Sequence, residues 1–445
     1  MCSLKSLPQS AVCGLLVLAA LTPTLAAAEG GRNVKIAVAA AEPNVDGEAL
    51  LVEECVTEPS CRVLQPCRGV PLGMLWWEAD YLLWWTKGMD IPPLVTAGST
   101  GALGNAGTRI LYGDEQILDD ARSGFRVGLG SWLDCGRCWG LEGDYWMLGK
   151  ATDHFRAASD AQGNPALFRP FFNINPRDED GEFDPPARED AEIVSMPALL
   201  AGTVMVDSFS ELQGAGIRVR HLLCCDSSCD ACCDACGQEH VLARNSRLDL
   251  LLGYRFVQLR EGLAVQEDLT SLLPAPDQGG FDIVDEFRTT NSFHGGDLGV
   301  AWRRRCGPWQ LDLLGKLALG STEQSVTIRG QTVISGSAAD DDTYVGGLLA
   351  QRTNSGTYRR NVFSMMPELG VGVGYRFARC LTARVGYNLL YWSRVARPGD
   401  QIDLAVNPDL LPPEDGFAGA ERPRFEFRDT DFWAQGIRVG LEGTW

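Results

Sequence analysis

The stretch LWWEADYLLWW at residues 75–85 decides the fold class. Every second side chain, beginning with Leu75, is apolar, and the intervening positions include two acids, Glu78 and Asp80. Successive side chains of a strand point to opposite faces, so this segment is predicted to have one apolar and one charged face. Strands of a transmembrane barrel have this pattern, with the apolar face toward lipid.

The same period of two returns along most of the chain. It is found at residues 125–129, 141–147, 217–219, 248–256, 298–302, 309–319, 369–377, 381–391 and 437–445. A strand that crosses the bilayer needs about nine to eleven residues. We therefore predict an all-β protein, an antiparallel up-and-down transmembrane barrel of about ten strands (range about 8 to 12).

The lengths of the links separate a barrel from a soluble sandwich, whose strands also alternate. Residues 87–121, 150–209, 322–361 and 395–430 form long links, whereas residues 135–138, 305–308 and 378–380 form short ones. Long extracellular loops and short periplasmic turns are typical of outer-membrane barrels. One link, residues 224–245, is predicted to lie in the periplasm although it is long.

Aromatic residues gather near the predicted strand ends, where interfacial girdles belong. They are Trp76, Trp77, Trp84, Trp85, Trp139, Trp146, Trp302, Trp309, Tyr391, Trp392 and Trp433. An ordinary core role is the alternative.

The N-terminus predicts export. Residues 1–28 contain an early lysine, an apolar stretch at 11–21 and small residues at 24–28, which is the pattern of a signal peptide. Residues 29–71 lack periodicity and are predicted to form a Cys-containing periplasmic lead-in or plug. Residues 72–445 then form the barrel, with a Cys-rich periplasmic insert at 224–245. No later run of about eighteen apolar residues follows, so insertion must use strands.

Composition narrows the function classes. The formal net charge of -19 argues against nucleic acid as a partner. The chain has only four histidines as candidates for acid–base catalysis. The nearest candidate for a catalytic pair, Asp153-His154, has no nucleophile beside it in the sequence. We predict no enzyme and no cofactor.

Charged residues on the other strand face are expected to line the barrel interior. A ring of about ten strands is narrow, and buried charges must be paired, so we expect a salt-bridged lumen with a small pore or none. The acids and bases nearly balance: Glu78, Asp80, Glu142, Asp144, Asp249, Asp312, Glu368 and Glu442 against Arg126, Arg218, Arg220, Arg255, Lys316, Arg376, Arg384 and Arg438.

The cysteines that follow the lead-in all fall in predicted periplasmic turns. An oxidising exported compartment favours disulfides. The candidates are Cys135, Cys138, Cys224, Cys225, Cys229, Cys232, Cys233 and Cys236. The spacing of the last six, with His240 beyond them, also suits zinc, so both readings stay open.

Several motifs resemble one known family. They are WWEADYLLWW at 76–85 followed by PPLVT at 92–96, ILYG at 110–113, RSGFR at 122–126 and GLEGDY at 140–145. Together they resemble beta-barrel porin family seven, which is abundant in planctomycete bacteria, over essentially the whole mature chain. The resemblance implies an outer-membrane barrel and supplies no substrate, reaction or binding residues.

Two functions remain open at this point. The first is a porin-like barrel, a narrow channel for small solutes or ions in the bacterial outer membrane. The second is a structural or surface-interaction barrel with a closed, salt-bridged lumen. Expected partners are outer-membrane lipid, the assembly machinery through the C-terminal Trp445, and other envelope proteins.

Overall fold

The computed structural model describes residues 75–134, 137–177, 183–228, 244–274, 278–336, 342–413 and 418–444. The chain divides into two units, Met1–Pro59 and Ser60–Trp445, and the described residues all belong to the second. The predicted signal peptide, the lead-in or plug, most of the Cys-rich insert and Trp445 lie outside them. Among these residues, no helix is long and apolar enough to cross a membrane.

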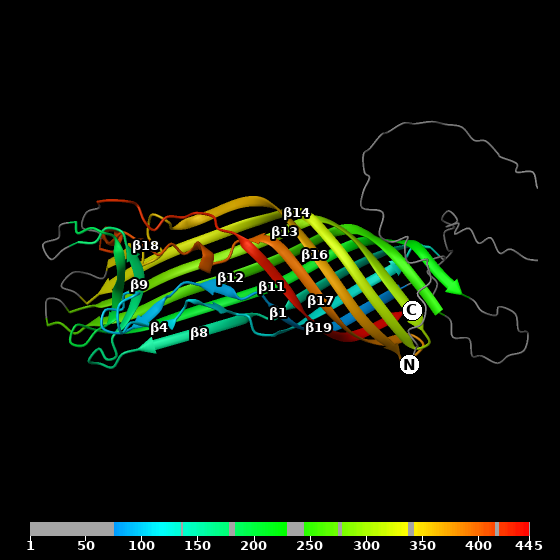
Figure 1. Cartoon of the computed structure of the whole chain (residues 1–445), viewed down its shortest axis with the longest axis horizontal. Coiled ribbons are helices and arrows are strands. Elements are labelled where there is room, and N and C mark those ends of the chain that lie inside the picture. Colours follow the sequence, from blue (N-terminus) through cyan, green and yellow to red (C-terminus); the bar gives the residue numbers. More distant parts are fainter. Residues whose placement is uncertain are drawn as a thin grey trace, which may run out of the picture. The chain divides into compact units, whose positions relative to one another are not determined.

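Ten of the described strands form a closed antiparallel ring (Figure 1). Each pairs with the next along the chain, and the first and last pair with each other to close the ring. They are β1 (Leu75–Thr86), β6 (Arg122–Trp132), β7 (Trp139–Leu148), β11 (Leu200–Ser228), β12 (Arg244–Ser271), β13 (Gly280–Cys306), β14 (Trp309–Ser335), β16 (Gly356–Arg376), β17 (Leu381–Val395) and β19 (Thr430–Thr444). The prediction of an up-and-down barrel of about ten strands is confirmed.

The strands are far longer than a bilayer requires. β11 to β14 have 29, 28, 27 and 27 residues. On β14, outward apolar side chains run from Trp309 to Leu319, which matches the length that a membrane strand needs. Beyond this belt the strand continues to Ser335, roughly another 53 Å at about 3.3 Å a residue. The predicted strand length of about nine to eleven residues therefore describes only the part of the strand in the apolar belt.

A row of polar side chains on neighbouring strands marks the edge of the apolar belt that lies away from Trp309, which we call its upper edge. Gln213, Gln258, Ser292, Glu323 and Asn361 stand opposite one another on five neighbouring strands. The amide of Gln213 donates to Gln258 at 3.1 Å, and that of Gln258 donates to Ser292 at 3.2 Å. Because such groups prefer water to hydrocarbon, this row places the boundary of the lipid-facing zone.

Beyond the polar row, the extended strands carry a folded structure that we call the head. It contains β2 (Met89–Ile91), β3 (Val95–Ala97), β4 (Arg109–Tyr112), β5 (Glu115–Ile117), β8 (Ala151–Ala158), β9 (Leu167–Asn173), β10 (Arg188–Ser195), β15 (Asp342–Val345), β18 (Ala405–Val406) and two 3₁₀ turns, η2 (Gly399–Gln401) and η3 (Pro408–Leu410). A buried apolar cluster of 25 residues holds these pieces to the strands. Much of the predicted loop sequence is therefore ordered strand.

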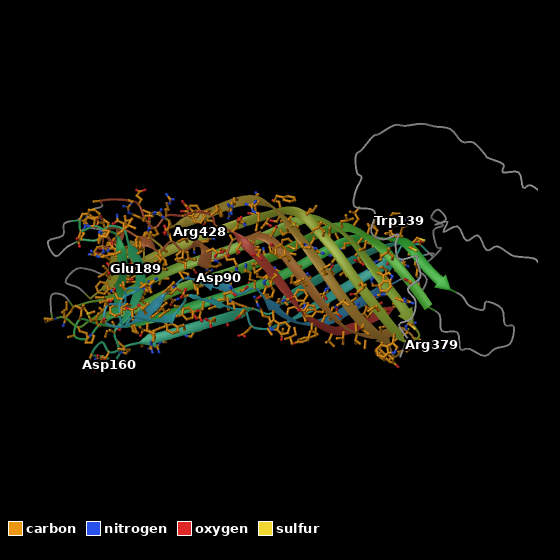
Figure 2. All side chains as sticks on the ribbon, viewed as in Figure 1. Asp90, Trp139, Asp160, Glu189, Arg379 and Arg428 are labelled. Carbon is orange, nitrogen blue, oxygen red and sulfur yellow. The ribbon has the colours of Figure 1, made fainter. Side chains whose placement is uncertain are left out.

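The other end of the ring holds the short links 133–138, 307–308 and 377–380, and we call it the turn end. Figure 2 labels Trp139 and Arg379 at this end, with Asp160 and Glu189 in the head.

The aromatic girdle was predicted only in part. Trp85, Trp139 and Trp309 are exposed on the outer face, at 37%, 40% and 56%. Trp76, Trp84, Trp146 and Trp392 instead point inward and are buried. Strand alternation gives the reason: in the pair Trp84-Trp85, one ring must face out and the other must face in.

Candidate functional site

The interior of the ring at the turn end is filled by charged side chains. Arg384 on β17 donates from Nη2 to Glu78 at 2.9 Å and to Asp80 at 3.0 Å, both on β1. Its Nη1 lies 3.4 Å from Glu442 on β19. Arg384 is 4% exposed and Asp80 is 3% exposed, so this group is held almost without water.

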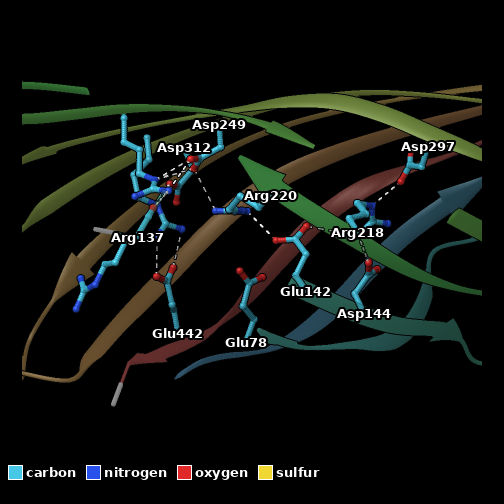
Figure 3. A network of polar contacts seen from close by, with 12 residues as sticks. Glu78, Arg137, Glu142, Asp144, Arg218, Arg220, Asp249, Asp297, Asp312 and Glu442 are labelled. Atoms are coloured by element: carbon cyan, nitrogen blue, oxygen red, sulfur yellow. Dashed lines mark hydrogen bonds and ion pairs between the residues drawn. The ribbon is translucent and has the colours of Figure 1, made fainter. Parts of the chain in front are cut away.

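Other ion pairs join strands that are distant in the ring. Arg126 on β6 lies 3.5 Å from Glu368 on β16, and Glu368 also receives Lys316 at 2.7 Å and Arg255 at 2.8 Å. Asp144 on β7 and Asp297 on β13 both bind Arg218 on β11 (Figure 3). Side chains from β6 and β16 can meet only across the interior, so these contacts bridge the lumen.

Of the sixteen residues predicted for the interior, all except Arg376 make at least one ion pair there. Arg376 is exposed at the end of β16. The structure adds Arg247, Asp297 and Arg303, which the sequence analysis omitted. Asp297 and Arg303 lie on the same strand face, opposite Leu298 and Trp302, so the alternation could have identified them.

A cavity of about 790 Å³ lies within the turn end. Trp132, Arg379 and Thr444 lie near its mouth, and Arg126, Asp144 and Lys316 line its inner part. In its wall, the rings of Trp76 and Trp132 are 4.6 Å apart, with the guanidinium of Arg247 4.2 Å from the centre of the Trp132 ring.

Between the charged interior of the turn end and the head, a layer of apolar side chains fills the interior of the ring. We call it the apolar layer. Nine of the ten ring strands contribute to it, and β6 contributes Gly124, against which Leu148 lies. Each member is at most 8% exposed: Leu82, Trp84, Trp146, Leu148, Leu212, Val257, Leu259, Phe293, Ala318, Met366, Leu390, Trp392, Val395, Phe432 and Ala434. Val257 and Phe293 neighbour Gln258 and Ser292 of the polar row, so the layer lies near the upper edge of the belt.

A second group of buried charges lies in the head. Arg169, 1% exposed, binds Glu267 and lies 2.6 Å from Asp285, while Glu192 approaches it at 3.8 Å. Burial and the neighbouring carboxylates raise the pKa of Glu192 well above its usual range, and burial raises the pKa of Glu267. At least one of these acids therefore retains a proton at a pH where an exposed glutamate is ionised.

The cysteines that the structure describes lie at the turn end. Cys138 and Cys380 are in short links, and Cys224 and Cys306 are near the ends of β11 and β13. Cys224, Cys306 and Cys380 form no disulfide with one another. Cys135, Cys229, Cys232, Cys233 and Cys236 lie outside the described residues, as does the side chain of Cys225.

The dipeptide Asp153-His154 is divided between two faces of β8. His154 lies outside the barrel, 2.7 Å from Asp207 and more than half exposed. Asp153 accepts a hydrogen bond from the hydroxyl of Tyr112 instead. The two side chains therefore do not converge on one site.

Solved structures with similar architecture include outer-membrane proteins of low sequence identity. The outer-membrane protease OmpT of Escherichia coli is 10% identical, with 84% of this chain and 97% of that chain covered and a TM-score of 0.37. The toluene transporter TodX of P. putida is 6% identical (84% and 90% covered, TM-score 0.17). A FadL homologue of Pseudomonas aeruginosa is 8% identical (84% and 90%, TM-score 0.20). No curated protein matches the sequence.

A known protein family matches nearly all of the barrel sequence. Residues 76–445 match the family described as "Putative beta barrel porin-7 (BBP7)", from the second residue of β1 to the C-terminus. The match and the ten-stranded ring with its outward apolar belt agree with each other. The chain therefore belongs to this porin family and is a β-barrel of the bacterial outer membrane, in contact with membrane lipid.

Proposed function

We propose that this protein is a closed, non-conducting barrel with a structural or surface-interaction role and no catalytic activity. The apolar layer is the observation that carries the proposal. An open pore would leave inward side chains wet along its whole length, whereas every member of this layer is nearly or fully buried.

The composition of the layer explains why it would block ions. A hydrated ion has to lose water to pass an apolar constriction. Burying an unpaired charge costs on the order of several kcal/mol, even after the surrounding protein relaxes. Trp84 and Trp146 lie 5.5 Å apart between ring centres, and Phe293 packs edge-on against Trp392 at 6.2 Å. These large rings fill the cross-section from opposite sides.

The head supports a role at the surface. Its β-strands and buried apolar cluster stand beyond the polar row, where lipid no longer contacts the barrel. A passive pore does not need such an extension. We infer that the head faces the exterior and the turn end faces the periplasm, because short turns are typical of the periplasmic side.

Two partner assignments follow from this orientation. Trp445 would act as the C-terminal aromatic residue that the assembly machinery recognises. The cysteines of the turn end would face other envelope proteins in the periplasm, where a disulfide between chains could form.

A gated channel is the second candidate function, and the cavity at the turn end favours it. About 790 Å³ of space, lined in part by charged side chains, already reaches from the turn end into the membrane zone. Opening would then require movement of only the apolar layer, as in pores that gate by dewetting.

Solute flux through proteoliposomes tests the proposal. We expect proteoliposomes with the wild-type protein to retain small solutes. Proteoliposomes with the variant W84A/W146A/W392A should release them, because these substitutions remove three large rings from the apolar layer. The matched control is W309A, which removes an exposed outer ring. Flux through the folded wild type equal to that of the triple variant would refute the closed barrel.

A further inference from the structure

The cavity at the turn end has an excess of positive charge, although the whole chain is strongly acidic. Among the residues that the structure describes, twelve cationic side chains and six carboxylates line it. Adding the paired residues just behind the wall, Asp80, Asp297, Glu368 and Arg255, still leaves four more cations than acids. The ion pairs among these described residues therefore leave an excess of positive charge at the site.

The excess is concentrated at the mouth of the cavity. Arg305, Arg376 and Arg379 line it, and none of the three forms an ion pair with a described residue. The Nε of Arg305 donates to the amide oxygen of Gln310 at 3.1 Å, which is a neutral partner. Three guanidinium groups at one mouth repel one another, and an anion bound between them would relieve this repulsion.

Hydrogen-bond donors are in excess deeper in the wall as well. Among the described residues, no partner accepts from the Nε of Arg220, Arg384 or Arg438. Arg384 is 4% exposed and Arg438 is 8% exposed, so water does not replace the missing acceptors. Buried polar groups are normally paired, which makes these donors a sign of an absent acceptor.

We propose that this cavity binds a small multivalent oxyanion, a molecule that carries at least two carboxylate or phosphate groups. Planar guanidinium forks suit both groups, and Arg is favoured where such anions are held in two-point contacts. The volume lies within the range of about 300–1,000 Å³ that is usual for small-molecule sites. The neighbouring Trp76 and Trp132 rings, tilted by 39° to each other, add an apolar wall for the body of the ligand. The site is open to the turn end and does not depend on whether the barrel conducts.

Calorimetric titration of the refolded full-length mature protein tests the proposal, with inorganic tripolyphosphate in one arm and citrate in the other. We expect saturable binding at one site in low salt. In the variant R305Q/R376Q/R379Q, affinity should fall at least tenfold. The matched control, R260Q/R288Q/R304Q, removes three exposed charges that do not line the cavity and should bind as the wild type does. Binding of tripolyphosphate alone would identify phosphate as the preferred group, and binding of citrate alone would identify carboxylate. Binding of neither, or equal loss in both variants, would overturn the proposal.

A second measurement uses the wild-type protein alone and does not require that the variant folds. Cys380 is exposed and lines the cavity, whereas Cys224 is exposed and does not line it. A saturating concentration of the anion that binds should slow maleimide labelling of Cys380 in the reduced protein and leave the labelling of Cys224 unchanged. Equal labelling of Cys380 with and without the anion would count against a site in this cavity.

Discussion

Arg303 on β13 donates to Glu442 on β19 at 2.7 Å, although three strands of the ring separate them. The same guanidinium lies 2.7 Å from Asp312. Arg303→Ala removes the shared cation and leaves two carboxylates with fewer partners, so we expect a loss of about 3 kcal/mol in the free energy of unfolding. Urea unfolding of the barrel in detergent measures this loss.

Arg304 provides the control for that variant, because it is the next residue on the strand and its side chain is exposed. Arg304→Ala should change stability by about 0.5 kcal/mol or less. If both variants unfold at the same urea concentration, the cross-lumen ion pairs do not stabilise the ring.

The outward belt predicts which positions cannot accept charge. Val371 and Leu441 are 45% and 40% exposed on strands that face lipid, and arginine at either position should cost about 2 to 4 kcal/mol near the midplane. Insertion is followed by heat-dependent gel mobility after refolding into vesicles. Ala161→Arg, in an exposed turn of the head, should insert normally. Normal insertion of all three variants would argue against the assignment of the belt.

The buried acids of the head predict a pH dependence. The pKa of Glu192 is higher in the folded protein than in the unfolded chain because of burial beside Glu267 and Asp285. The stabilisation from its bound proton is complete below the unfolded pKa of about 4.5 and is lost as the pH rises through the folded pKa.

Glu192→Gln keeps a neutral side chain at every pH, so it should stabilise the head at pH 8 and have little effect at pH 4. Protease resistance of the head at the two pH values measures the difference. A variant that is less stable than the wild type at pH 8 would show that ionised Glu192 is needed by Arg169.

The cysteine cluster also has a defined test. We predict that the cysteines of residues 224–236 form disulfides in the exported protein rather than a zinc site. Alkylation under denaturing conditions should then label them only after reduction, and a chelator should have no effect. Labelling that appears with the chelator alone would favour zinc.

The ring itself could be predicted because its physical cause is local. In the membrane belt, each strand alternates between lipid and a charged interior, and segments such as residues 369–377 show that alternation directly. The strand extensions were missed because Ser321, Glu323 and Ser325 on β14 face water, so the outward face no longer differs from the inward face in polarity. The head was missed for a related reason, since short strands such as β9 depend on contacts with distant segments.

The interior was predictable as a set of charges but not as a sequence of layers. Alternation identifies Trp84, Trp146 and Trp392 as inward, yet their common level depends on the register between strands. That register places Gln258 opposite Gln213 and Ser292, and with it the apolar layer at one height. One sequence gives no information on such pairings.

The central claim is that the apolar layer closes the barrel, and single-channel conductance in a planar bilayer tests it most directly. The protein is first shown to be folded by its heat-dependent gel mobility. We predict that the folded, inserted wild type carries no steady current, and that W84A/W146A/W392A does. A steady conductance from the wild type would contradict the closed barrel and establish a pore.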